Sequence, residues 1–410
     1  MLTRAKGATP DPEPASDRAP LHSADGPTRA LDIGVISERF YPDSLAVAVR
    51  LRHLVQALAA LPGARVTLFT ASRGVTTQGC RVVRTWAPPV SNELPYLLRL
   101  VAEAGLGLEL AFRLLLSRRR IWVITSPPFV AAWLCSLACV LRRAPYVLDV
   151  RDSYPQVFFV VGVVRPDSLV GRWLGRLEAS LYRRAVLLAV ATQGLAEHVQ
   201  RRCGQAGKIV LLTNGFDADL FRVAPVKYPT FTAVFHGNLG RFQRPDLIVR
   251  LARRCQEAGL GIHFLVIGWG SNRDEFREQV PGNLEFRGRV PYEEIPAIIG
   301  QAHVGLSFRT DDEVSRASFP VKVYEYLGVG IPVLVTPRSE GGEFVETHQI
   351  GYQFAPDDED AIFNRLVWLY QHADDLQALA RRCQALRQRF SRAFLSQQFA
   401  ATLAARLTPR

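Results

Sequence analysis

The sequence predicts an α/β fold with two doubly wound domains that face each other across a cleft. Short apolar segments alternate with helical patterns over about residues 31–405, which is typical of parallel sheets covered by helices on both faces. A proline-containing segment at 224–230 interrupts this alternation, which then restarts. The length of 410 residues is too great for one ordinary core. Ligands of such sheets bind at the carboxyl ends of the strands.

Six apolar segments of the first half are expected to be buried strands. They lie at 31–37, 65–70, 121–126, 146–150, 186–191 and 209–212. A helix is expected from about 46 to 61, and longer apolar helical segments at 94–116 and 129–141. The segment at 94–116 carries four charged residues and is amphipathic, whereas 129–141 is too short to span a bilayer. No membrane-spanning helix is therefore predicted.

Five apolar segments of the second half are expected to form the second sheet. They lie at 231–236, 261–267, 284–286, 303–308 and 331–336. The last of them follows a short helix whose two ends are marked in the sequence. Proline is tolerated in the first helical turn and glycine just past the last one, so Pro320 and Gly330 are expected to bound this helix.

The domain boundaries are expected at the breaks in this pattern. Residues 1–29 are rich in Pro, Ala, Asp and Arg and have no apolar run, which predicts a disordered tail without a signal peptide. The other expected parts are an N-terminal domain (30–223), a linker (224–230), a C-terminal domain (231–388) and a C-terminal helix that crosses back to the N-terminal domain (389–410).

The net charge of +12 is concentrated in the first half of the chain. Residues 30–220 carry 23 basic and 13 acidic side chains, whereas residues 221–410 carry 23 and 21. A basic half suggests an anionic partner, either nucleic acid or acidic lipid headgroups. The arginine pairs and triplets lie at the ends of apolar helical segments with few aromatic residues between them, which favours a membrane surface over stacked bases. Solvated helix ends are the alternative interpretation.

The six cysteines are not expected to form a metal site. Cys135 and Cys139 are one helical turn apart, but no histidine or second cysteine pair completes a zinc set. Most cysteines lie in apolar helical contexts, so buried thiols in a reducing compartment are expected.

The helix between Pro320 and Gly330 carries the strongest chemical signal. Lys322 and Glu325 lie three residues apart, close to its N-terminus. Free N–H groups and partial positive charge at a helix N-terminus suit a phosphate. A carboxylate beside that phosphate is well placed to accept hydrogen bonds from sugar hydroxyls. The alternative is an ordinary helix–strand unit with a surface ion pair.

The motifs resemble the retaining glycosyltransferases of family 4, which have the GT-B fold of two Rossmann-like domains. In the second half, the resemblance rests on four motifs in the family's order, at 236–240, 267–270, 288–291 and 320–336. The first half resembles the fucosamine-transferase-like branch of bacterial O-antigen and capsule biosynthesis, through motifs at 125–128, 149–155 and 213–217.

The resemblance implies transfer of a hexosyl or N-acetylhexosaminyl group from a nucleoside-diphosphate sugar, with UDP as the expected nucleotide. The implied acceptor is a glycan or a polyprenyl-linked glycan. No cofactor and no metal are expected, and nucleic acid is not an expected partner. The implied location is the cytoplasm, peripheral at the inner face of the membrane.

The resemblance also implies a set of donor-binding residues. They are Gly237, Asn238, Gly240, Arg241, Gln243, Gly268, Gly270, Pro320, Lys322, Glu325 and Tyr326. Among them, Arg241 and Lys322 would stabilise the charge on the leaving diphosphate. Glu325 would bind the ribose hydroxyls.

On the acceptor side, the resemblance implies Ser44, Asp149, Arg151 and Asp152. Asp152 follows the end of a strand and is the expected residue for acid–base work or acceptor positioning. Asp149 alternatively has a structural role. His236 is expected to be a polar residue at a strand end rather than a catalytic base.

Two departures from the family pattern leave other functions open. Ala317 stands where many members have a glutamate eight positions before Glu325, although Asp312 or Glu313 could substitute. The first strand-to-helix turn, at 42–46, lacks the usual glycines. One alternative is therefore a catalytically inactive GT-B protein that binds a sugar nucleotide or scaffolds a membrane assembly complex. A sugar-nucleotide epimerase of the same fold is another, and the basic first half argues against it.

Overall fold

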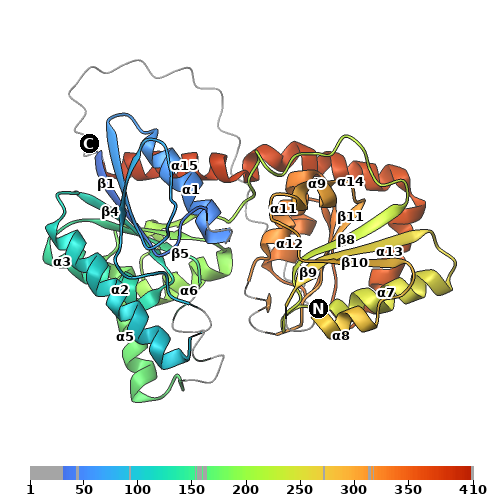
Figure 1. Ribbon diagram of the computed structural model, residues 1–410, viewed down its shortest axis with the longest axis horizontal. Helices are drawn as coiled ribbons and strands as arrows, with labels where there is room; N and C mark the ends of the chain where they lie inside the picture. The colour runs from blue at the N-terminus through green and yellow to red at the C-terminus, as the bar shows by residue number, and fades with distance from the viewer. Residues whose placement is uncertain are drawn as a thin grey trace, which may run out of the picture.

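The protein consists of two parallel sheets, each covered by helices on both faces (Figure 1). The computed structural model describes residues 31–42, 46–91, 94–152, 154, 159, 164–270, 273–312, 315–316 and 318–407. The predicted fold class, with two doubly wound domains, is confirmed. The predicted disordered tail lies outside the described residues.

The N-terminal sheet has seven parallel strands in the order β3-β2-β1-β4-β5-β6-β7. Its strands are β1 (Leu31–Ser37), β2 (Ala64–Thr70), β3 (Cys80–Arg84), β4 (Ile121–Ser126), β5 (Tyr146–Val150), β6 (Leu187–Val190) and β7 (Ile209–Leu211). The edge strand β3 was not predicted, because its alternating polar residues and partial exposure leave no continuous apolar run. The other strands are present with small shifts at their ends.

The two faces of this sheet carry separate cores. On one face lie α2 (Tyr96–Leu116), α3 (Phe129–Leu141), α5 (Leu169–Arg184) and α6 (Gln193–Cys203). On the other face lie α1 (Ala46–Ala59) and α15 (Arg392–Leu407). Neighbouring residues of the central strands alternate between the two cores, as Val123 and Ile124 do. The predicted helices at 46–61, 94–116 and 129–141 correspond to α1, α2 and α3.

The C-terminal sheet has six parallel strands in the order β10-β9-β8-β11-β12-β13. Its strands are β8 (Phe231–Asn238), β9 (Ile262–Trp269), β10 (Leu284–Gly288), β11 (Val304–Ser307), β12 (Val333–Val335) and β13 (Gly351–Gln353). Its helices are α7 (Pro245–Glu257), α8 (Arg273–Glu278), α9 (Ile295–Gly300), α11 (Val321–Val329), α12 (Glu340–Thr347), α13 (Glu359–Gln371) and α14 (Ala373–Leu386). The three-residue edge strand β13 was not predicted.

The predicted boundaries of α11 agree with the structure. Pro320 is its N-cap, and Gly330 follows its last residue in the left-handed conformation with φ of 76°. Tyr326 on this helix is fully buried, and its hydroxyl donates to the carbonyl oxygens of Val234 (3.0 Å) and Leu306 (3.1 Å). These bonds fix α11 against the centre of the sheet.

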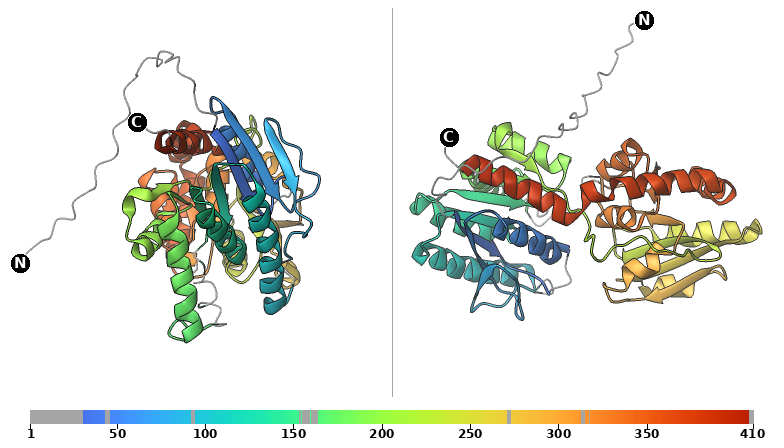
Figure 2. Two further views of the ribbon diagram at one scale, coloured as in Figure 1. Left: turned by 90° about the vertical axis from the view of Figure 1, so that its left-hand side faces the viewer. Right: turned by 90° about the horizontal axis from the view of Figure 1, so that it is seen from above.

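The chain crosses between the two sheets twice, and the two crossings lie side by side. After α14 and a short 3-10 turn (Arg387–Phe390), α15 runs over the N-terminal sheet and packs on α1 (Figure 2). At the crossing, Phe216 forms a parallel bridge with Ser391. The Phe216 N–H donates to Phe390 O at 3.2 Å, and the Arg392 N–H donates to Phe216 O at 2.8 Å. We call residues 214–216 and 390–392 the hinge bridge.

Two further expectations concern the membrane and the cysteines. Within the described ranges, no helix is long and apolar enough to cross a bilayer. All six cysteines are free, and five of them are buried; Cys80 is partly exposed. Burial raises the pKa of several of these thiols, which suits an inert structural role.

Candidate functional site

The carboxyl edges of the two sheets face each other. Glu340 begins α12, and its carboxylate accepts hydrogen bonds from the backbone N–H groups of Gln193 (2.6 Å) and Gly194 (2.8 Å) at the start of α6. The helix α6 follows β6 and α12 follows β12, so both helices start beyond the carboxyl ends of their strands. This contact joins the two domains and places the predicted donor and acceptor residues on facing edges.

At the carboxyl edge of the C-terminal sheet, Lys322 lies over the end of β8. Its Nζ lies 3.8 Å from the centre of the Phe235 ring and donates to Gln243 Oε1 at 3.1 Å. A Cβ added to Gly237, whose φ is 121°, would lie 3.5 Å from the same Nζ. The structure therefore brings together Gly237, Gln243 and Lys322, which are separated by up to 85 residues in sequence.

A second cation lies beside Lys322 and was missed by the sequence reasoning. Arg309 follows β11, is only 9% exposed, and forms an antiparallel bridge with Gln243. Its Nη1 donates to Ser318 Oγ, just before α11, while its Nε has no hydrogen-bond partner among the described residues. Burial, and then the nearby Arg309 charge, lower the pKa of Lys322 to about 7. A buried cation next to a partly buried one forms a site suited to an anion.

Glu325 is buried, so the alternative of a surface ion pair with Lys322 is wrong. Glu325 is 5% exposed, and its Oε1 accepts a hydrogen bond from the Tyr292 hydroxyl at 3.0 Å. Its Oε2 lies 3.4 Å from His236 Nε2. Burial raises the pKa of Glu325, and Arg392, Tyr292 and Lys322 oppose that rise. The spacing of Lys322 and Glu325 predicted two neighbouring side chains on the surface of one helix, but it could not predict that other elements bury Glu325.

His236 is held neutral at this site. Burial, and then the charge of Lys322, lowers its pKa to about 3. Its ring lies edge-on to Tyr326, with the ring centres 5.1 Å apart. A histidine with this pKa is a weak proton acceptor at neutral pH, in agreement with the expectation that it is not the catalytic base.

Two of the predicted donor residues, Gly268 and Gly270, are at positions where packing within the fold requires glycine. The φ of Gly270 is 144°, and a Cβ there would overlap the Asn238 side chain and the Leu239 backbone. At Gly268, a Cβ would lie 2.7 Å from the Gly237 carbonyl oxygen. Close packing between the ends of β8 and β9 therefore accounts for both glycines.

The remaining donor residues differ in how accessible they are. The Arg241 side chain is exposed and makes no hydrogen bond or ion pair with any described residue. Tyr326 is buried with its hydroxyl committed to the sheet, so its position does not support the predicted donor contact. Asp312 accepts from the N–H (2.9 Å) and hydroxyl (3.0 Å) of Ser315, which commits it to its own turn. Glu313 and Ala317 lie outside the described residues.

The acceptor-side residues lie at the end of β5. Asp149 is 1% exposed and accepts from Arg50 Nη2 at 2.9 Å, and the same nitrogen donates to Leu212 O at 2.8 Å. This agrees with the structural alternative for Asp149. Arg50 was not singled out from the sequence, although an arginine within an apolar helix pattern is a usable signal.

Arg151 and Asp152 lie just beyond this strand. Arg151 Nη2 donates to Pro127 O at 3.0 Å. Desolvation raises the pKa of Asp152, and the neighbouring Arg151 lowers it. Asp152 is accessible at the edge that faces the C-terminal domain, while Ser44 lies outside the described residues. Across the described ranges, no group of three His, Cys, Asp or Glu side chains is arranged to hold a metal ion.

Both halves of the chain match known families. Residues 46–215 match the family described as "Glycosyl transferase 4-like domain", and residues 230–372 match "Glycosyl transferases group 1". The chain is 26% identical over 211 residues to WcaL of Escherichia coli (strain K12), a glycosyltransferase assigned to colanic acid biosynthesis. It is 24% identical over 233 residues to WbjE of Pseudomonas aeruginosa, also assigned as a glycosyltransferase. These matches cover 49% and 53% of this chain and 52% and 58% of the two relatives, so the chain spans about half the length of the curated relatives it matches.

Solved structures share the whole fold. HepE (Alr3699) of Anabaena, solved in complex with UDP, superposes with a TM-score of 0.65 at 17% identity, over 91% of this chain and 100% of that one. WaaG, a glycosyltransferase involved in lipopolysaccharide biosynthesis, gives a TM-score of 0.63 at 14% identity, over 90% of this chain and 99% of that one. At these identities the superposition shows the fold alone.

Proposed function

We propose that this chain, which belongs to the family 4 glycosyltransferases with the GT-B fold, moves a sugar from a nucleoside-diphosphate sugar to an acceptor in bacterial surface polysaccharide biosynthesis. The observation that carries the proposal is a pair of neighbouring cations, the partly buried Lys322 and the buried Arg309, beside Gly237 near the end of β8 and the turn that follows it. A diphosphate bound there would be neutralised by both side chains and approached by the backbone of the turn.

The chemistry follows from the charge that develops as the sugar leaves. When the bond between the sugar and the diphosphate breaks, negative charge grows on the diphosphate oxygens, and fixed cations stabilise it. Transfer with retention requires the acceptor to approach the same face of the sugar that the diphosphate leaves. Asp152, on the opposite edge, is the proposed residue for positioning the acceptor. Because its pKa is raised, the Asp152 carboxyl holds a proton more strongly than an ordinary aspartate does.

We further propose that no divalent metal takes part, because the cations and the start of α11 supply the positive charge. Excess chelator is then expected to leave the activity of the purified protein unchanged. Loss of activity with chelator, with recovery in magnesium or manganese, would contradict this part of the proposal.

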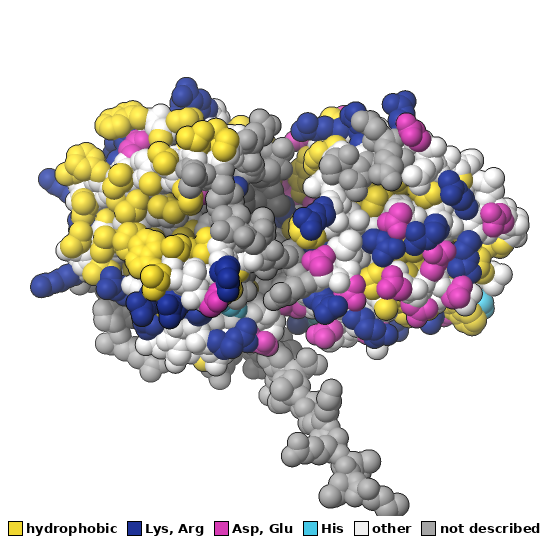
Figure 3. Space-filling view, turned by 90° about the horizontal axis from the view of Figure 1, so that it is seen from below, with side chains coloured by type: hydrophobic (Ala, Val, Ile, Leu, Met, Phe, Trp, Pro, Cys, Tyr) yellow, Lys and Arg dark blue, Asp and Glu magenta, His cyan; other side chains and the backbone are white. Residues whose placement is uncertain are grey.

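The proposed partner of the N-terminal domain is an anionic membrane surface. Six side chains along α2 are exposed apolar residues, namely Leu98, Val101, Leu108, Phe112, Leu115 and Leu116. Leu169, Val170 and Trp173 on α5 are exposed as well. Figure 3 shows hydrophobic side chains gathered over this domain, with Lys and Arg at the margin. Apolar burial with a basic margin supports reversible binding to anionic lipid, where a polyprenyl-linked acceptor would be presented.

A donor panel tests the proposed reaction. The full chain is incubated with UDP-linked and GDP-linked sugars and a polyprenyl-linked acceptor, and both released nucleoside diphosphate and glycosylated acceptor are measured. One donor that gives both products in stoichiometric amounts is the expected result. Binding of a donor with no release would favour the inactive-homologue alternative, and conversion of the donor to another sugar nucleotide would favour the epimerase.

A further inference from the structure

Arg392 is a buried arginine at the hinge bridge whose terminal nitrogens are unpaired. The residue is 2% exposed, and its Nε donates to Asn214 O at 3.0 Å. Its Nη1 and Nη2 make no hydrogen bond of ordinary length and angle with any described residue, although the guanidinium lies close enough to the Tyr292 hydroxyl to oppose the rise in the pKa of that group. Buried polar groups are nearly always paired, and an unpaired buried guanidinium is costly, so this arrangement calls for an explanation.

The hinge bridge packs directly on the helix that carries Glu325. The Arg392 N–H donates to Phe216 O at 2.8 Å, and a Cβ on Gly328 would lie 2.5 Å from the Phe216 ring. On the other crossing, the ring centre of Phe390 lies 6.0 Å from that of Tyr324. Because Tyr324 and Gly328 lie on either side of Glu325 along α11, the hinge bridge and this carboxylate are held together by packing.

Four groups from four elements act on the Glu325 carboxylate, two by direct contact (Tyr292 and His236) and two through their charge (Lys322 and Arg392). They are Lys322 on α11, Tyr292 before α9, His236 on β8 and Arg392 on α15. His236 is neutral because its pKa is lowered to about 3, and burial raises the pKa of Tyr292, which keeps its hydroxyl protonated. Lys322, with a pKa of about 7, is only partly charged at neutral pH. The one member that is always charged is therefore Arg392, and it opposes the rise in the pKa of Glu325 more than Tyr292 or Lys322 does.

We propose that Arg392 is a positioning residue for Glu325: from the hinge, its guanidinium keeps the carboxylate ionised and oriented to accept the ribose hydroxyls of the donor. This inference rests on the proposed function, since it assumes that Glu325 binds the nucleotide. Arg392 is also bonded to Asn214 and begins the helix that packs on α1.

A double-mutant cycle with UDP as the probe tests this inference. UDP dissociation constants are measured by calorimetry between pH 5 and pH 8 for the wild type, Arg392→Met, Glu325→Gln and the double variant. In Arg392→Met the pKa of Glu325 rises further, so UDP affinity is expected to fall on the order of tenfold at pH 7 and by more at lower pH. With Glu325→Gln there is no carboxylate to ionise, so adding Arg392→Met is expected to change the constant by less than about twofold.

Arg387→Met is the matched control. Arg387, in the 3-10 turn that leads into the hinge bridge, also binds backbone, donating from Nε to Gly328 O at 2.6 Å and from Nη2 to Phe221 O at 2.7 Å. We expect this variant to lower the melting temperature without changing the pH dependence of UDP binding. Should Arg392→Met not fold, Arg392→Gln replaces it in the cycle, and because it also removes the charge, the same loss of UDP affinity is expected.

The outcomes separate this inference from the function on which it rests. Equal loss of UDP affinity from Arg392→Met, or from Arg392→Gln where that variant replaces it, with and without the Glu325 carboxylate would mean that Arg392 is only structural and would overturn the inference. An unchanged affinity and pH profile in Arg392→Met would overturn it as well. A wild-type protein that binds no UDP would instead overturn the proposed UDP-sugar site itself.

Discussion

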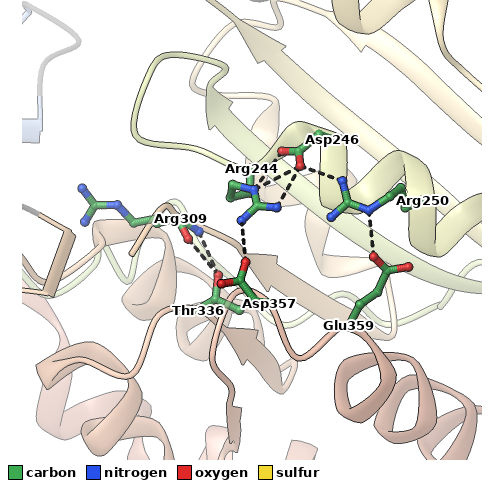
Figure 4. Close-up of polar contacts among 7 residues, drawn as sticks. All are labelled: Arg244, Asp246, Arg250, Arg309, Thr336, Asp357 and Glu359. Atoms are coloured by element: carbon green, nitrogen blue, oxygen red, sulfur yellow. Dashed lines mark hydrogen bonds and ion pairs between the residues drawn. The ribbon is translucent and has the colours of Figure 1, made fainter. Parts of the chain in front are cut away.

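The two domains share one architecture but present different surfaces. On the C-terminal domain, a cluster of partly exposed arginines is paired with carboxylates. Arg244 and Arg250 both contact Asp246, at 2.9 and 2.8 Å, and Arg250 also contacts Glu359 on α13 at 2.7 Å (Figure 4). On the N-terminal domain, α2 and α5 expose large apolar side chains instead, and exposed arginines such as Arg120 lie at the helix ends.

The two domains therefore share the pattern of buried residues that determines the fold and differ in the surface residues that determine binding partners. Both sheets are parallel, both are buried on two faces, and both bring their carboxyl edges to the same region. Acid–base pairs on the C-terminal domain keep its surface hydrated and close to neutral. Exposing a large apolar face to water is costly, and burial of that face in a bilayer would remove the cost, so the membrane surface remains our proposal for the N-terminal domain.

The largest expected effect is on membrane binding by α2. Replacing Leu108 and Phe112 by aspartate removes two side chains that are 61% and 55% exposed and adds charge that anionic lipid repels. About 3 kcal/mol or more of binding free energy should be lost, which is roughly a hundredfold in the partition coefficient. Co-sedimentation with vesicles of varied anionic lipid content and salt measures it.

The matched control for this comparison is Trp368→Asp on the C-terminal domain. Trp368 is 44% exposed on α13, where its indole N–H donates to Asp375 Oδ2 at 2.9 Å and its ring stacks on His372. Vesicle binding is expected to be unchanged in this variant. The distinction between the two surfaces would be wrong if Trp368→Asp lost as much vesicle binding as the Leu108 and Phe112 variant. It would also be wrong if wild-type binding did not depend on lipid charge and salt.

The next effect concerns the cation over Gly237. Lys322→Ala removes a charge-assisted contact with the diphosphate, which should raise the activation free energy by about 1.5–3 kcal/mol and lower donor kcat/KM roughly 10- to 160-fold. Initial rates over a range of donor concentrations measure this value. Arg250→Ala, on the same domain but in the ion-pair cluster of Figure 4, should leave kcat/KM unchanged. Normal kinetics in Lys322→Ala would remove the phosphate assignment.

The same residue predicts a pH dependence with a definite sign. Lys322 has a pKa of about 7 in the free protein, and only its protonated form attracts the diphosphate. Donor kcat/KM, which reports the free enzyme, should therefore fall as pH rises through about 7. Lys322→Arg stays charged at every pH tested and should abolish this decline. A decline that persists unchanged in Lys322→Arg would assign it to another group.

A smaller effect is expected for the contact that joins the two domains. Glu340→Ala removes the carboxylate that accepts from Gln193 and Gly194, a helix-capping interaction that typically contributes about 0.5–2 kcal/mol. The present domain arrangement should become less populated, and small-angle X-ray scattering should show a larger radius of gyration. Glu343→Ala, in the same first turn of α12 but exposed, is the control and should scatter like the wild type.

The sequence was sufficient for the elements that are specified locally. The bounds of α11 follow from Pro320 and Gly330, and the central strands follow from continuous apolar runs. Two edge strands were not predicted: β3 is partly exposed along its length, and β13 has only three residues. Their pairing is decided by the neighbouring strand rather than by their own composition.

The site was harder to predict, because its members come from distant segments. Lys322 and Glu325 were found from their spacing on one helix. The groups that set their charge, Arg309 and Arg392, lie 13 residues before and 70 residues after Lys322 in the chain. An arginine directly after a buried strand or at a crossing helix has no local pattern that distinguishes it from a surface arginine. Only tertiary packing brings them to the donor edge.

The smallest expected effect compares one arginine from each surface. Arg250→Ala breaks pairs with Asp246 and Glu359 that are largely solvent-exposed, so it should lower the free energy of unfolding of the C-terminal domain by no more than about 1 kcal/mol. Arg120→Ala, at an exposed end of the apolar face, should leave stability unchanged but weaken binding to anionic vesicles by roughly 1 kcal/mol. Urea unfolding and vesicle co-sedimentation measure the two quantities on the same pair of variants. The opposite pattern, with Arg250→Ala impairing vesicle binding and Arg120→Ala impairing stability, would mean that the charged surface of the C-terminal domain meets the membrane.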